Sequence, residues 1–123
     1  MKITSNPHLF VDETLVMRHD GTSLRLHQPQ REGIALMTDE PWEGPMSGYF
    51  TVIDAGDTYL LYYRGTSTVV DTIEEVTCVA ESDDGIEWRR RKTWQYTLNG
   101  SRANNVVWAN ERLVSHNMAP FLD

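Results

Sequence analysis

Two β-rich runs joined by a tight turn restrict this chain to an antiparallel arrangement. They lie in GYFTVIDAGDTYLLYYRG, residues 48–65, on either side of the turn Asp54-Ala55-Gly56-Asp57. Glycine at such a turn supplies the positive φ that a hairpin needs. A third run follows in EVTCVAE, residues 75–81, and a fourth covers residues 86–91. Because short turns join antiparallel neighbours, the four consecutive runs predict an antiparallel sheet.

The link between the third and fourth runs has the pattern Ser-x-Asp-Gly-x-x-Trp, formed by Ser82, Asp84, Gly85 and Trp88. Serine and aspartate side chains accept hydrogen bonds from backbone amides in tight turns, and glycine takes the left-handed conformation. The tryptophan would return on the next strand and pack between sheets. We interpret the pattern as the tip of a hairpin, which makes its role structural.

The rest of the chain also favours strands, since no useful stretch has the 3.6-residue period of a helix. LFVDETLVM (9–17) and SLRLH (23–27) predict strands within residues 1–37. Residues 46–96 have the length and order of one complete four-stranded blade of a β-propeller, and residues 103–123 look like the start of the next blade. The predicted fold class is therefore all-β. A β-sandwich built from the same short strands is the alternative.

Composition excludes several functional classes. The 123 residues carry 11 Lys+Arg against 18 Asp+Glu, a net charge of -7, which disfavours nucleic acid as a partner. The basic run RRRK, residues 89–92, is too local to change this and is interpreted as a solvated strand end. No apolar run approaches the roughly 18 residues of a membrane span. The single cysteine, Cys78, is expected to pack in the core, and the four histidines lack metal-ligand spacing, so we expect neither metal nor cofactor.

Several stretches resemble a known family. They are LFVDETLV (9–16), PWEGPMSGYFTVI (41–53), YLLYYRG (59–65), GSRANNVVW (100–108) and HNMAPFLD (116–123). With the Ser-x-Asp-Gly-x-x-Trp turn, they are similar to the N-terminal part of five-bladed β-propeller glycoside hydrolases, the arabinanase, levansucrase and invertase superfamily. The resemblance implies a carbohydrate substrate, an oligo- or polysaccharide, and a hydrolase that uses paired carboxylates.

The length predicts an incomplete propeller. At roughly 40–50 residues per blade, five blades need well over 200 residues. We therefore expect either missing C-terminal blades or self-association that closes the ring. The N-terminus has no apolar segment typical of a signal peptide, and one unpaired cysteine suits the cytoplasm, which is favoured without being fixed.

Glycoside hydrolysis needs two carboxyl groups across the scissile bond, one of them acting as an acid. Asp12 lies in an otherwise apolar run and points either to a central funnel or outward. Glu43 follows Trp42 in a Pro-rich loop, where an indole beside an acid is typical of a sugar platform and a solvated turn is the alternative. Asp39 shares that loop with weaker support. The resemblance implies that HNMAPFLD faces the pocket, which adds Asp123 to the catalytic candidates Asp12 and Glu43.

The predicted sugar contacts are side chains able to stack on a ring or bond hydroxyls. Arg64 ends a strand, where it clamps a ligand or pairs with a neighbouring acid. Arg102 forms a polar patch with Asn104 and Asn105, although turn formation also explains the asparagines. The full set of predicted substrate-binding residues is Trp42, Arg64, Arg102, Asn105, His116 and Asn117.

Three functions remain open from the sequence. The first is the N-terminal part of a carbohydrate-active propeller, a glycosidase that is inactive as this isolated chain. The second is a non-catalytic sugar- or protein-binding module, and the third is an assembly fragment without a ligand. Glycan binding that survives Asp123→Asn favours the second over the first, and a clean closed oligomer in light scattering favours assembly.

Overall fold

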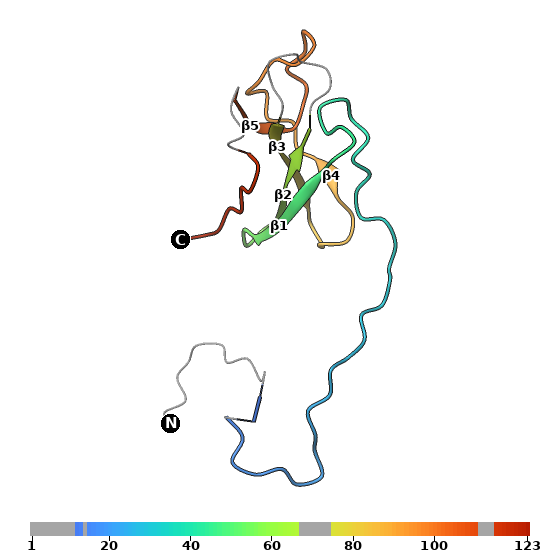
Figure 1. The fold of residues 1–123 in the computed structure, drawn as a ribbon, viewed down its shortest axis with the longest axis vertical. Coiled ribbons are helices and arrows are strands. Elements are labelled where there is room, and N and C mark those ends of the chain that lie inside the picture. The colour runs from blue at the N-terminus through green and yellow to red at the C-terminus, as the bar shows by residue number, and fades with distance from the viewer. Residues whose placement is uncertain (1–11, 14, 67–74, 111–114) are drawn as a thin grey trace. The chain divides into compact units, whose positions relative to one another are not determined.

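The computed structural model describes residues 12–13, 15–66, 75–110 and 115–123, and the chain divides into two compact units, Met1–Glu32 and Gly33–Asp123. Figure 1 shows the course of the chain and the strand labels. Nowhere in these described ranges is there a helix, so none is long and apolar enough to cross a membrane. The all-β prediction is confirmed at this level.

The first unit contains turns and bends, with no strand in its described part. The amide of Val16 donates to the carbonyl of Glu13 at 2.9 Å, which closes a turn in the region predicted as a strand over residues 9–17. Part of that region lies outside the described residues. The predicted strand at residues 23–27 is also absent, and Leu24 and Leu26 are 49% and 89% exposed. An alternating pattern forms a stable strand only where a neighbour completes its hydrogen bonds and a core covers its apolar face.

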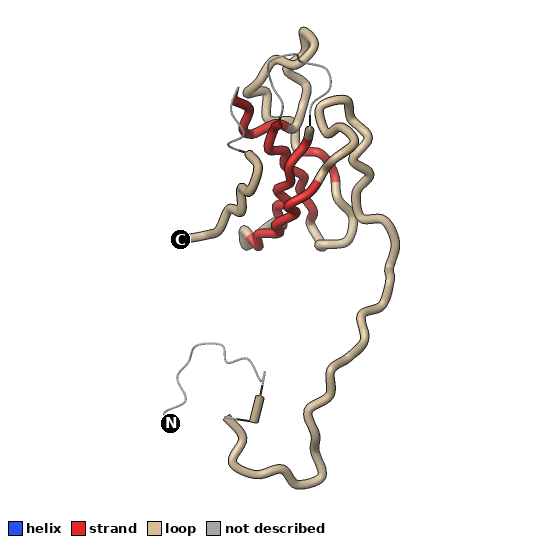
Figure 2. Tube along the Cα trace, in the orientation of Figure 1, coloured by secondary structure: helices blue, strands red, loops and turns tan. Residues whose placement is uncertain are grey.

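The second unit contains one antiparallel sheet. Its strands are β1 (Gly48–Asp54), β2 (Tyr59–Gly65), β3 (Glu75–Ser82), β4 (Arg89–Arg90) and β5 (Val106–Asn110), drawn in red in Figure 2. They follow the order β1-β2-β3-β4, as the consecutive hairpins predicted, and β5 also pairs with β3.

The outer edge of β3 is shared by two strands. β4 pairs only with Ala80 and Glu81, whereas β5 pairs with residues from Glu75 to Cys78. β5 falls in the stretch assigned from sequence to a next blade, yet it joins the same sheet as β3. The physical reason is that a two-residue β4 leaves most of this β3 edge with unpaired backbone groups, which need partners.

The core covers one face of β2 and β3. Its buried side chains are Leu61, Tyr63, Val76, Cys78, Ala80, Leu98 and Val106. Cys78 packs among them as predicted, and burial raises the pKa of its thiol well above the ordinary value. The thiol therefore stays protonated and unreactive.

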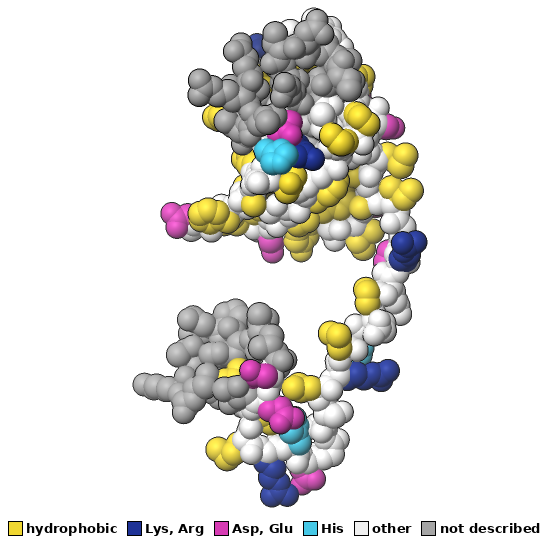
Figure 3. Space-filling model, viewed as in Figure 1, with side chains coloured by type: hydrophobic (Ala, Val, Ile, Leu, Met, Phe, Trp, Pro, Cys, Tyr) yellow, Lys and Arg dark blue, Asp and Glu magenta, His cyan; other side chains and the backbone are white. Residues whose placement is uncertain are grey.

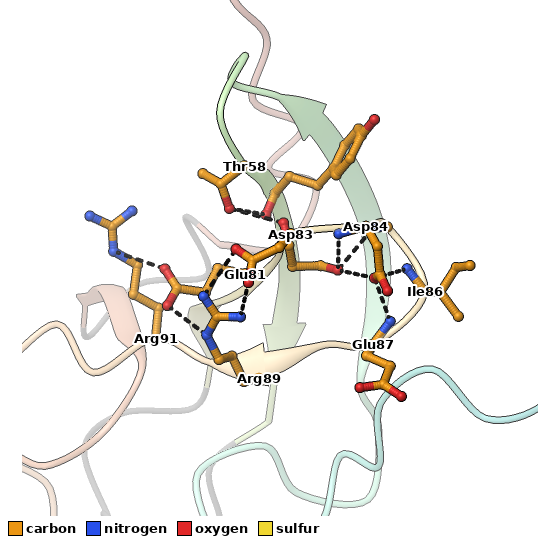
Figure 4. Close-up of polar contacts among 11 residues, drawn as sticks. Thr58, Glu81, Asp83, Asp84, Ile86, Glu87, Arg89 and Arg91 are labelled. Carbon is orange, nitrogen blue, oxygen red and sulfur yellow. Dashed lines mark hydrogen bonds and ion pairs between the residues drawn. The ribbon is translucent and has the colours of Figure 1, made fainter.

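The hairpin tip between β3 and β4 has the predicted geometry. Ser82 Oγ accepts from the amide of Gly85 at 2.9 Å, and Asp84 Oδ1 accepts from the amides of Ile86 and Glu87 at 2.8 and 2.9 Å (Figure 4). Gly85 has a φ of 75°. The amides donating to Asp84 lower the pKa of its carboxyl group. The interpretation of this pattern as a structural turn is confirmed.

Candidate functional site

The turn before β1 rests on the end of β2 because Gly65 has no side chain. A Cβ at Gly65 would lie 2.6 Å from the carbonyl oxygen of Trp42 and 2.9 Å from the Cα of Glu43. The amide of Thr66 donates to the carbonyl of Glu43 at 2.8 Å, which fixes the approach. A residue larger than glycine would push the turn away, so Gly65 is what allows Glu43 to enter the sheet unit's interior.

The Glu43 carboxylate is 0% exposed and has four hydrogen bonds. Oε1 accepts from the hydroxyl of Tyr63 at 2.5 Å and from Nε of Arg90 at 2.9 Å. Oε2 accepts from Nη2 of Arg90 and from the amide of Glu40, both at 2.9 Å. A carboxylate has about four acceptor positions. Each of them is used here, so the solvated turn, which was the alternative to a sugar platform, is wrong, and Glu43 is a buried anchor.

The network around Glu43 extends to two more of the predicted site residues. Asn105 Nδ2 donates to the hydroxyl of Tyr63 at 2.8 Å and to the carbonyl of Val79 at 3.0 Å. Its Oδ1 accepts from Nε1 of Trp42 at 2.7 Å. Burial raises the pKa of Tyr63, which keeps its hydroxyl available as a donor. We refer to Trp42, Glu43, Tyr63, Arg90 and Asn105 as the Glu43 network.

Arg90, the second residue of the basic run, is held by hydrogen bonds and does not point into solvent as Arg89 and Arg91 do. Its Nη2 also donates to Asp39 Oδ1 and to the carbonyl of Met37, both at 2.6 Å. The hydrogen bond to Glu43 raises the pKa of Arg90, so the guanidinium stays charged. Arg89 and Arg91 are exposed and lie beside Glu81 (Figure 4), as expected of a solvated strand end. That interpretation is wrong for Arg90, because successive strand residues point to opposite faces.

A second polar cluster lies on the other face of the same strand end. Arg64 Nη1 lies 3.3 Å from Oε1 of Glu75 and 3.0 Å from Nδ1 of His116, and that Nδ1 lies 2.9 Å from the same Glu75 oxygen. In one tautomer His116 donates to Glu75, and in the other it accepts from Arg64. Arg64 thus pairs with a neighbouring acid, the alternative left open from sequence.

An aromatic ring completes this cluster. Tyr49 lies at a β-bulge in β1 with a φ of 55°, and bulges redirect side chains. The guanidinium carbon of Arg64 lies 4.7 Å from the Tyr49 ring centroid, and the His116 ring lies 5.6 Å from it. Tyr49 therefore packs against both a cation and an imidazole.

Three buried polar atoms in this region have no hydrogen-bond partner within the described part of the chain. They are Nε of Arg64, Oε2 of Glu75 and Oγ of Ser115. Buried polar atoms in native proteins are nearly always paired, and exceptions often mark a bound water or ligand. We name Tyr49, Arg64, Glu75, Ser115 and His116 the Arg64 cluster and take it as the candidate site. Figure 3 shows a histidine beside acidic and basic side chains on the surface of the sheet unit.

The other predicted residues lie elsewhere. Asp12 is an exposed residue of the first unit, and Asp123 and Asn117 are exposed near the C-terminus. Arg102 is exposed and donates to the carbonyl of Gln95 at 3.1 Å. Asn104 is buried and closes its own turn, donating to Tyr96 and accepting from the amide of Val106. The structure thus brings together Trp42, Glu43 and Asn105 in one cluster and Arg64 and His116 in the other.

Five members of the two clusters were not among the predicted site residues: Tyr49, Tyr63, Glu75, Arg90 and Ser115. Arg90 could have been found by applying strand alternation to the basic run. No sequence pattern indicated Glu75 as a site residue, because only the register of β3 places it beside the end of β2. Across the described ranges no group of three His, Cys, Asp or Glu side chains is placed to hold a metal ion.

Comparison with known proteins found no matching family model, no matching curated protein and no matching solved structure.

Proposed function

We propose that this chain contributes an antiparallel blade to a carbohydrate-active β-propeller of the glycoside hydrolase type, and that the Arg64 cluster binds sugar hydroxyls. The observation that supports this is the convergence of Arg64, Glu75 and His116 from three segments, with a donor and an acceptor that have no hydrogen-bond partner among the described residues. A hydroxyl both donates and accepts, so one sugar hydroxyl can satisfy Glu75 Oε2 and Arg64 Nε together.

Access to these atoms requires a movement. Arg64 and Glu75 have side chains only 13% and 9% exposed, whereas the side chain of His116 is 49% exposed. In our proposal, His116 shifts to admit the ligand, and the ring of Tyr49 offers an apolar face to the sugar. After this shift the His116 ring hydrogen-bonds the ligand in place of Arg64 and Glu75, so His116 remains a contact of the bound sugar.

The blade assignment is supported by strand order and by exposed apolar side chains. The four strands β1 to β4 follow one another in space as they do in sequence. Phe50 and Val52 of β1 are 55% and 56% exposed on the face that bears Tyr63. In a propeller, neighbouring blades pack face to face and would cover such side chains.

Catalysis requires carboxyl groups beyond the Glu43 network. The four hydrogen bonds of Glu43 leave it no free acceptor for proton exchange with a substrate. In this proposal Glu43 holds β2 and β4 together, and the catalytic pair draws on Asp12 or Asp123 with acids from other blades. A non-catalytic sugar-binding module is the second candidate, and the saturation of Glu43 favours it.

Glycan binding tests the proposal. Oligosaccharides are titrated into the protein and followed by NMR chemical shifts, using wild type, Arg64→Gln and His116→Ala, with Arg89→Gln as a control that removes a cation outside the cluster. We expect binding to be lost in the first two variants and kept in the control. Unchanged binding in His116→Ala would contradict the proposal.

Activity assays separate the two candidates. We expect no turnover of aryl glycosides by this chain alone, and turnover would show that it contains a complete catalytic pair. Sugar binding that is insensitive to Asp123→Asn would favour the non-catalytic module.

A further inference from the structure

A hollow lies beside β3, between the part of the strand that pairs with β4 and the part that pairs with β5. Its lining is formed by Tyr62, Val79, Arg91, Lys92, Thr93, Gln95 and Val107, and its volume is about 320 Å³. Tyr62 and Val79 are paired across β2 and β3. Because side chains alternate along a strand, Tyr62 lies on the same face as Arg64 and on the face opposite Tyr63.

The hollow results from the divergence of the two strands. β4 ends at Arg90 and β5 begins at Val106, so the intervening chain leaves the edge of β3. It remains attached at Val79, whose carbonyl accepts from the amide of Arg91 at 3.4 Å and whose amide donates to the carbonyl of Asn105 at 2.9 Å. The gap between these attachments is open on the Tyr62 face.

The rim is held in place by several hydrogen bonds. Thr93 Oγ1 donates to the carbonyl of Val106 at 2.6 Å, and the amide of Thr93 donates to the carbonyl of Asn104 at 3.0 Å. The carbonyl of Gln95 accepts from Arg102 at 3.1 Å. These bonds fix the backbone and leave the side chains of Arg91, Lys92 and Gln95 at the hollow.

The charge at the rim is positive although the chain is acidic. Within the described residues, Arg91 has one ion pair, from Nε to Glu81 at 3.7 Å, and Glu81 is shared with Arg89 at 3.2 Å. Lys92 Nζ lies 6.0 Å from the Trp94 ring and forms no ion pair in the same part of the chain. Two basic residues thus line the hollow together with the apolar Val79 and Val107 and with Tyr62.

We propose that this hollow binds a small organic anion about the size of a monosaccharide, held by its carboxylate or phosphate group. Arg91 and Lys92 pair with the acidic group, the side chain of Gln95 bonds a neighbouring polar group, and the valines with Tyr62 contact the apolar part. The volume suits such a ligand, since small-molecule pockets begin at about 300 Å³. Guanidinium and ammonium groups are the usual protein partners of carboxylate and phosphate groups. This inference does not depend on the sugar-binding role of the Arg64 cluster.

Calorimetric titration with D-glucuronate, glucose 6-phosphate, D-glucose and inorganic phosphate tests this proposal. We expect saturable binding of at least one organic acid, weakened by added salt, and no binding of D-glucose. The preferred acid identifies the group as carboxylate or phosphate. Equal binding of D-glucose, or inorganic phosphate binding as tightly as both organic acids, would overturn the proposal, as would no binding of either organic acid.

Variants locate the site. Arg91→Gln and Lys92→Gln are each expected to weaken binding about tenfold, the loss typical of one charge-assisted hydrogen bond. Arg89→Gln removes an equal charge two residues before Arg91, from a residue that does not line the hollow, and should leave affinity unchanged. Arg64→Gln should also leave it unchanged, which separates this hollow from the Arg64 cluster. Equal affinity in Arg91→Gln and wild type would overturn the assignment even if an anion binds.

Discussion

Tyr63 and Arg64 are consecutive residues of β2, yet they belong to two polar clusters that differ in how completely their hydrogen bonds are formed. On one face, Tyr63 joins the Glu43 network, in which the buried carboxylate has four donors. On the other, Arg64 joins a cluster in which three buried polar atoms have no partner among the described residues. The two environments lie on opposite faces of β2 and are separated by one position along the strand.

The difference indicates which cluster stabilises the fold and which cluster can bind a ligand. A buried polar network whose members are all paired rigidifies the structure, and removing one member exposes the others to a large penalty. A cluster with unpaired members stabilises the fold less, because the penalty is already present. It also keeps hydrogen-bonding capacity for a ligand. The first three predictions below test this contrast, and the fourth concerns a turn outside both clusters.

The largest effect is expected for Glu43→Gln. The amide keeps the size of the side chain but replaces an acceptor with a donor that faces Arg90, so the guanidinium loses its buried counter-charge. We expect a loss of about 3–5 kcal/mol in the free energy of unfolding, measured with urea. The control is Asp39→Asn, which alters the other acid at the same Arg90 nitrogen. Asp39 is 66% exposed, so its loss should be only about 0–1 kcal/mol. Equal losses would show that the burial of Glu43 is not decisive.

A smaller effect is expected for Tyr63→Phe. This change removes the hydroxyl that donates to Glu43 and accepts from Asn105, leaving two buried groups with one bond fewer. The expected loss is about 1–3 kcal/mol in the same measurement. Tyr62→Phe, at the next position on the opposite face, is the matched control and should change stability by no more than about 0.5 kcal/mol. A larger effect of the control would contradict the contrast between the faces.

Glu75→Gln should cost still less, about 1 kcal/mol, and should weaken sugar binding. Glu75 Oε2 has no hydrogen-bond partner to lose among the described residues, and the amide oxygen can still accept from Arg64. Chemical denaturation and glycan titration on the same sample separate the two outcomes. If Glu75→Gln destabilised the fold as much as Glu43→Gln, the Arg64 cluster would be a second anchor and its proposed ligand role would fail.

The smallest effect concerns Asp84, in the turn that follows β3, at the end of that strand opposite Glu75. Backbone amides lower its pKa below the usual 3.8, so the folded state holds its proton less tightly than the unfolded state. Its stabilisation is therefore complete above pH 3.8 and is lost as the pH falls through the lower folded value. Asp84→Asn should remove the part of the acid-induced loss of stability that comes from Asp84. It should leave the hydrogen bonds of the two clusters at neutral pH unchanged. Thermal unfolding from pH 5 to pH 2 measures it, and an identical pH profile in the variant would contradict the assignment.

Much of the sheet followed from local pattern. The hairpin at Asp54 to Thr58, the Ser82 turn and the packing of Cys78 depend on residues close in sequence or on simple alternation. The strand at residues 23–27 was predicted by the same alternation and does not form, because Leu24 and Leu26 find no core in the described residues. A pattern thus predicts a strand reliably only when a partner strand is also encoded nearby.

The candidate site was predictable in part. Arg64, His116, Trp42, Glu43 and Asn105 were selected for their chemistry, and the structure places each of them in a polar cluster. Sequence could not say which cluster was saturated, since this depends on Arg90 and Glu75 arriving from other strands.

The amino-acid sequence by itself determined the strand class, the order of β1 to β4 and the chemistry of the turns, because these depend on contacts within a few residues. The tertiary structure alone decided that β5 joins β3, that Glu43 is buried against Arg90, and that Arg64 meets His116. Those outcomes depend on register, between residues 28–35 positions apart for β3 and β5, and on polar contacts between residues 41–63 positions apart. At such separations the partner of a polar group is set by packing and not by its neighbours in sequence.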